Sequence, residues 1–111
     1  FAIDGGQFYG TLYSKGNISG SVTIDFKNGN VVTATLTGNV TSLAFSNIKT
    51  GGIYYLHFIQ DALGPWTLTV PTALKVNGGY TISAGVNKRD LLICSATSTT
   101  QLYCSKAQDQ Q

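Results

Sequence analysis

The one histidine of the chain is the first residue to consider for chemistry. His57 lies in the middle of Ile53–Gln60, the most apolar stretch of the sequence. A histidine that acts as a general base needs a nucleophile beside it and an acid that orients it. None of the serines lies in a G-x-S-x-G or comparable setting. We therefore expect His57 to pack on a sheet face or at a subunit contact, and we predict that the protein is not an enzyme.

The carboxylates give no stronger indication of catalysis or of metal binding. Paired carboxylates can serve a glycosidase, but here they are scattered along the chain and no calcium-loop motif occurs. Two cysteines and one histidine are too few for a zinc site. We therefore predict no cofactor, no metal site and no catalytic residue. The acidic residues considered are Asp4, Asp25, Asp61, Asp90 and Asp109.

Cys94 and Cys104 flank a polar stretch that is typical of a strand, a turn and a second strand. If the turn centres on Thr99, the two cysteines lie directly opposite each other. A cross-strand disulfide closing a loop of about ten residues then becomes feasible. The alternative is a pair of small apolar side chains on one sheet face.

Three residues are candidates for binding a ligand, namely Trp66, Tyr80 and Asn77. A flat aromatic ring can cover the apolar face of a sugar, and Trp66 follows the Gly64-Pro65 turn, where partial exposure is plausible. The alternative is that these aromatic side chains belong to the core or to an interface, which is the more common place for them in β proteins.

The composition excludes several classes of protein. Only 11% of the residues are charged, compared with about 25% in ordinary globular domains. The net charge is +2, and Lys88-Arg89 is a basic step of only two residues, so we expect no nucleic-acid partner. No apolar run approaches the roughly 20 residues that span a bilayer, so we expect no membrane insertion. The chain is rich in Thr, Gly, Ser and Asn and contains no Glu or Met, which argues against a helical protein.

Alternation of apolar and polar residues with period two is the dominant pattern, and it indicates half-buried strands. Residues 21–27 and 31–37 both alternate, and Asn28-Gly29 between them favours a tight hairpin. Ile53–Gln60 is the most apolar expected strand, and residues 90–96 and 100–105 form the last expected hairpin. Further expected strands are 40–46, 66–70 and Leu74–Val76.

These elements predict an all-β fold, an antiparallel β-sandwich (jelly-roll-like) of about eight to ten short strands. We expect residues 20–106 to form this module. Residues 1–19 form an N-terminal arm or an edge strand, and residues 107–111 a flexible tail. The length corresponds to one domain.

Several stretches also resemble, in order and spacing, a β module found near the C-termini of bacteriophage tail-fibre, head-fibre and other minor structural proteins. The similarity covers roughly residues 20–105 and consists of many weak signals without a catalytic motif. Residues 29–47 match its strand pair, and residues 51–61 match its strand and turn. Shorter matches are 66–71, 78–79, 90–92 and 100–103.

The resemblance implies a structural, fibre or spike domain on the virion surface. Such a domain assembles as an oligomer, usually a homotrimer, contacts neighbouring virion proteins and contributes to host attachment, with a host-surface glycan as a further expected partner. The apolar residues on both faces of Ile53–Gln60 agree with assembly, because large exposed apolar patches are rare in monomers. The alternative is a carbohydrate-binding β-sandwich module that is not tied to a virion and is secreted.

Overall fold

Strands account for almost all of the regular structure, as the alternating pattern predicts. A computed structural model describes residues 2–4 and 7–110, and within these ranges it contains one 3₁₀ turn and no α-helix. The prediction of an all-β chain is therefore confirmed. The elements are β1 (Ala2–Asp4), β2 (Gln7–Tyr9), β3 (Leu12–Asp25), η1 (Phe26–Asn28), β4 (Val31–Ser46), β5 (Ile53–Gln60), β6 (Leu74–Val76), β7 (Arg89–Ser95) and β8 (Leu102–Gln110).

Six of the strands form one mixed sheet in the order β3-β4-β5-β7-β8-β6, and β1 pairs with β2 separately. The pairs β3–β4, β4–β5 and β6–β8 are parallel, whereas β5–β7 and β7–β8 are antiparallel. The sheet thus differs from the predicted antiparallel arrangement at three of its five pairings. The physical reason is that alternation determines which side chains face the core and leaves the identity of the neighbouring strand open.

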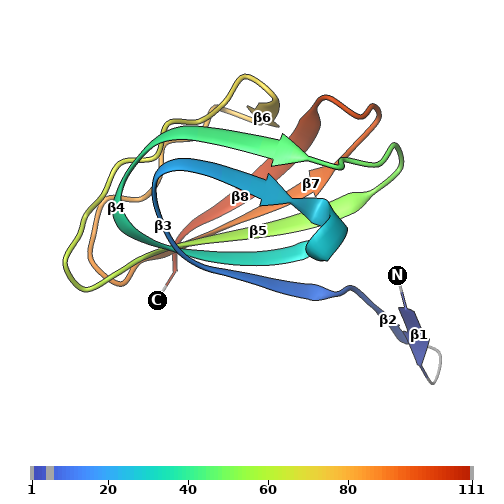
Figure 1. Ribbon diagram of the computed structural model, residues 1–111, viewed down its shortest axis with the longest axis horizontal. Helices are drawn as coiled ribbons and strands as arrows, with labels where there is room; N and C mark the ends of the chain where they lie inside the picture. Colours follow the sequence, from blue (N-terminus) through green and yellow to red (C-terminus); the bar gives the residue numbers. More distant parts are fainter. Residues whose placement is uncertain (1, 5–6, 111) are drawn as a thin grey trace.

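The parallel pairing arises because β3 and β4 are long and both turn back over the sheet (Figure 1). The second half of each strand lies in a layer above its first half, and β4 follows β3 side by side from Leu12↔Val31 to Asp25↔Ser46. Register shifts lie on either side of Gly20, which has φ 67°. A bulge together with a residue that tolerates positive φ lets the strand curve sharply.

The core lies between the two layers and is built from the inward residues of the alternating strands. These side chains are 1% exposed or less, so each contributes most of the burial energy it can offer, about 1.5–3 kcal/mol for a large apolar side chain. The most deeply buried apolar residues are Ile24, Val32, Leu36, Val40, Leu56, Phe58, Leu92 and Leu102.

The predicted hairpin at Asn28-Gly29 is wrong. After β3 the chain makes the turn η1 and descends to the other layer, where β4 begins beside the start of β3. The second half of β3 therefore pairs with the second half of β4, and the two expected hairpin strands lie in different layers. Asn-Gly supports a tight turn both in a hairpin and in a turn that leads the chain into another layer. The local sequence therefore did not distinguish these two arrangements.

Two other expected strands differ from the structure. Residues 31–46 form one bent strand, where the sequence predicted two separated at Gly38-Asn39. Residues 66–70 form no strand; their regular pairing is a single parallel bridge between Leu68 and Val40. The extended strands β3 and β4, of 14 and 16 residues, also exceed the short strands that were expected.

Both ends of the chain contribute to the sheet. Residues 12–19 belong to edge strand β3, which is one of the two alternatives expected for the N-terminal part, whereas β8 continues to Gln110, into the expected flexible tail. Phe1, Gly5, Gly6 and Gln111 lie outside the described residues. In the described part of the chain, no helix has the length and apolar character required to cross a membrane.

Candidate functional site

One face of the sheet carries apolar side chains that the core does not use. Along β5 every second residue is buried, which turns Ile53, Tyr55, His57 and Ile59 away from the core. The neighbouring strands alternate in step with β5. We call this surface the outer face. Its residues are Leu12, Val31, Thr33, Thr35, Ile53, Tyr55, His57, Ile59, Leu91, Ile93, Tyr103, Ser105 and Ala107.

Strand register places the apolar side chains of the outer face in continuous rows. Tyr55 lies between Val31 of β4 and Ile93 of β7, and Leu12 continues this row onto β3. Leu12 is 64% exposed, Ile93 42% and Tyr103 48%. Because monomeric proteins rarely expose large contiguous apolar patches, this face indicates a contact surface.

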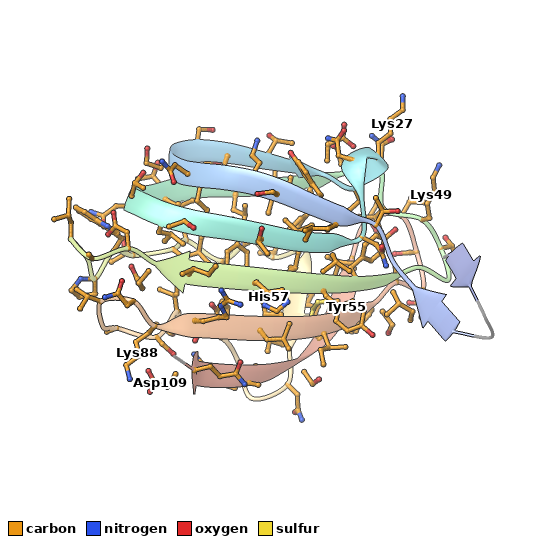
Figure 2. All side chains as sticks on the ribbon, turned by 90° about the horizontal axis from the view of Figure 1, so that it is seen from below. Lys27, Lys49, Tyr55, His57, Lys88 and Asp109 are labelled. Atoms are coloured by element: carbon orange, nitrogen blue, oxygen red, sulfur yellow. A yellow bond between two sulfur atoms is a disulfide. The ribbon has the colours of Figure 1, made fainter. Side chains whose placement is uncertain are left out.

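Charged side chains lie toward the margins of the outer face rather than at its centre. Figure 2 looks onto this face and shows Tyr55 and His57 in the middle of β5, while Lys88 and Asp109 lie at one end and Lys27 and Lys49 at another. Among the charged residues of these strands, Arg89 lies closest to the centre of the face, because it pairs with Ile59 of β5. The centre of the face therefore carries no charged side chain, and its polar groups are the His57 imidazole and the hydroxyls of Thr33 and Thr35.

His57 occupies that centre, as the sequence predicted for a histidine packed on a sheet face. It lies between Thr33 of β4 and Leu91 of β7. Its Nδ1 atom is buried and has no hydrogen-bond partner among the described residues. Burial, and secondarily the positive charge of Arg89, lower the pKa of the imidazole below its usual value.

A second candidate site is a groove of about 670 Å³ beside β6 and β8. Two of the three predicted binding residues, Asn77 and Tyr80, line it, and so does Tyr103, which the sequence did not single out. The volume lies within the range of small-molecule sites. The exposed ring of Tyr103 and the exposed amide of Asn77 give this groove an aromatic surface and a hydrogen-bonding group.

The third predicted binding residue, Trp66, does not reach this groove. Its ring packs against the core, and its indole N–H donates to Asp61 Oδ1 at 2.8 Å. Its backbone N–H donates to Gln60 Oε1, also at 2.8 Å. Trp66 therefore fastens the turn after β5 while remaining partly exposed, as expected from the sequence, and its role in ligand binding stays a prediction.

Tyr80 is held in place by the buried carboxylate of Asp90, which the sequence analysis considered but did not single out. Asp90 is 1% exposed and accepts hydrogen bonds from the Tyr80 hydroxyl and the Ser83 amide, both at 2.8 Å. Burial, and then the hydrogen bond to Asp90, raise the pKa of Tyr80. Alternation of Asp90 with Leu92 and Cys94 was the signal that would have placed this aspartate on the inward face.

Cys94 and Cys104 lie directly opposite each other on β7 and β8, and their sulfur atoms are joined in a disulfide. The bond lies on the inward face and Cys104 also lines the groove. A loop of this length is expected to stabilise the hairpin by about 2–3 kcal/mol. Among the described residues, no group of three His, Cys, Asp or Glu side chains could hold a metal ion.

No family model, curated protein or solved structure matches this chain.

Proposed function

We propose that this chain is a structural module of a viral fibre or spike, of the bacteriophage type, which acts by assembling with copies of itself and not by catalysis. The observation that carries the proposal is the apolar outer face, where Leu12, Ile93 and Tyr103 remain exposed at the surface of one copy. Covering such a patch with a second copy removes apolar area from water, worth about 25 cal/mol per Å².

The edges of the sheet favour face-to-face contact over growth by strand addition. Edge strand β3 carries register shifts near Gly16 and Gly20, and edge strand β6 has only three residues. Bulges and short strands are devices that block edge-to-edge pairing. We therefore propose that the two layers behave as a sandwich whose outer face packs around an axis, most simply as a homotrimer on the virion surface, where its loops contribute to host attachment.

Replacing Ile93 by lysine tests the assembly. We expect the wild-type chain to have a molar mass that is a multiple of 11.8 kDa in light scattering, and Ile93→Lys to shift the population to the monomer. The reason is that a lysine would have to be buried without a partner in the contact, which costs several kcal/mol.

The matched control is Val86→Lys, because Val86 is 45% exposed, much like Ile93, and lies outside the outer face. This variant should keep the wild-type mass. A wild-type monomer over the whole accessible concentration range, or equal behaviour of the two variants, would contradict the proposal.

The groove favours a second candidate function, a secreted carbohydrate-binding module. Aromatic rings commonly supply the apolar contact in small-ligand sites, and a few polar groups fix orientation. In this groove Tyr103 would stack against a neutral sugar while the amide of Asn77 binds its hydroxyl groups.

Replacing Asn77 by alanine tests this second candidate. If a glycan array identifies a saccharide that binds, Asn77→Ala should weaken its binding about tenfold in calorimetry, as expected for loss of a hydrogen bond of about 1.4 kcal/mol. Asn28→Ala is the control, because Asn28 is also exposed and lies outside the groove. An array without any bound saccharide, or equal loss in both variants, would rule out a sugar site at this groove.

A further inference from the structure

We propose that His57 makes the contact between copies sensitive to pH, so that the neutral imidazole permits assembly through the outer face and the imidazolium opposes it. This inference rests on the proposed assembly and adds its regulation. It starts from position, because His57 lies at the centre of the face while the labelled lysines and Asp109 lie around it (Figure 2).

The occupant of the outer face is a second copy of this chain. Four strands about 4.8 Å apart, with about seven residues each, together with Leu12 of β3, give the face an area of roughly 450 Å². Two such faces meeting directly cover about 900 Å², close to the lower bound of about 1,000 Å² for a specific interface, and three faces around an axis cover about 1,350 Å² in all. None of the outer-face residues defined above is acidic, so a partner selected by its positive charge has nothing to bind there.

The groups around His57 offer no compensation for a positive charge. From β4 it faces the Thr33 side chain, and from β7 it faces Leu91 and, one pair further along, Arg89. On its own strand the neighbours on the same face are Tyr55 and Ile59. Asp90 of β7 points to the other side of the sheet, into the core.

The direction of the effect follows from which state binds the proton. Burial already lowers the pKa of His57 in one copy, and Arg89 lowers it further. A second copy would remove the remaining water from the ring, so the assembled state would bind a proton still less readily. The separated copies therefore take up protons that the assembly excludes, and the dissociation constant rises as the pH falls through the histidine range.

The test measures the dissociation constant of the intact chain by sedimentation at a series of pH values. We expect self-association to weaken about tenfold or more between about pH 7.5 and pH 5. His57→Gln should assemble with little change over the same interval, because glutamine does not titrate. Circular dichroism at each pH verifies that both proteins remain folded.

Each outcome decides between the two proposals. If the wild-type chain assembles with the same pH profile as His57→Gln, the histidine switch is wrong and the assembly stands. If neither protein assembles at any pH, the proposed function fails, and the switch fails with it. If His57→Gln is monomeric, His57→Phe provides the second test, and its assembly must be independent of pH.

Discussion

Asp90→Ala is expected to lower the free energy of unfolding by about 3–5 kcal/mol, which is a large part of the stability of a domain of this size. Asp90 is the second residue of β7, and its side chain is buried and bonded to Tyr80, which lines the groove. The loss should appear as a reduced midpoint in urea unfolding at neutral pH.

The magnitude follows from what the carboxylate holds. Its Oδ2 atom accepts from the Tyr80 hydroxyl and the Ser83 amide at 2.8 Å, and from Gln108 Nε2 at 3.4 Å. Its Oδ1 atom accepts from the Asp109 amide at 3.2 Å. Alanine would leave the Tyr80 hydroxyl and the Ser83 amide without this acceptor, and each unsatisfied buried group costs about 1–3 kcal/mol. The Gln108 and Asp109 donors keep the Ser83 hydroxyl as an acceptor.

Two variants separate the network from a general effect of removing an aspartate. Asp90→Asn keeps the shape and one carbonyl oxygen, so it should unfold between the wild type and Asp90→Ala. Asp25→Ala removes a carboxylate at the end of β3 and should cost much less. Equal midpoints for Asp90→Ala and Asp25→Ala would show that the buried network adds little stability.

The same carboxylate makes stability depend on acid. Burial raises the pKa of Asp90, but hydrogen bonds from Ser83, Tyr80 and Asp109 outweigh burial and hold the pKa below its usual value. The stabilisation is therefore present above the unfolded-chain pKa of about 4 and is lost as the pH falls through the lower folded value. Asp25 also has a lowered pKa, chiefly because of its hydrogen bond to Asn47, and so it also makes stability depend on acid. Because Asp25 is present in both the wild type and Asp90→Asn, the difference between their unfolding free energies as a function of pH isolates the contribution of Asp90.

The sequence predicted well what depends on neighbouring residues. Alternation placed Leu56 and Phe58 on one face of β5 and His57 on the other, and the structure has this arrangement. The turn centred on Thr99 placed Cys94 opposite Cys104, where they are found. These features follow from the two-residue period of a strand and from a short turn.

The parallel pairing could not be predicted from the same signals. Val22 pairs with Leu43, a residue 21 positions away, because both strands bend into the second layer. A hairpin between residues 21–27 and 31–37 would present the same inward side chains, so the apolar pattern fits both. Only the bend near Gly20 decides between them, and a glycine in a strand indicates a bulge without giving its direction.

The candidate sites also combine features that neighbouring residues determine with features that only the folded chain determines. Trp66 is partly exposed, as its place after Gly64-Pro65 suggested, but its hydrogen bonds to Gln60 and Asp61 depend on the exact shape of this turn, which the residue types do not specify. Tyr103 contributes to both the groove and the outer face because β6 pairs with β8 across about 28 residues of sequence, Lys75 lying opposite Tyr103. No local pattern brings those two residues together.

Gly29→Ala is expected to lower the free energy of unfolding by about 3 kcal/mol, because this glycine lies where the chain drops from the second layer to the first. A Cβ atom there would lie 2.6 Å from the Thr11 carbonyl oxygen and 3.1 Å from Tyr13 Cβ. The residue also has φ 150°, which other residues rarely adopt. The Thr11 oxygen cannot move aside easily, because it accepts from the Asn30 and Val31 amides, both at 3.1 Å.

Gly51→Ala is the matched control, since Gly51 also has positive φ, at 85°, but a Cβ there would meet nothing within 4 Å. It should cost about 1 kcal/mol, the backbone contribution alone. The difference between the two variants in urea unfolding measures the close approach of the turn to Thr11. A hairpin at Asn28-Gly29 would hold no such contact between the turn and the start of β3. Equal losses for Gly29→Ala and Gly51→Ala would therefore contradict the coiled course of β3 and β4, and with it the arrangement that leaves Leu12 and Val31 on the outer face.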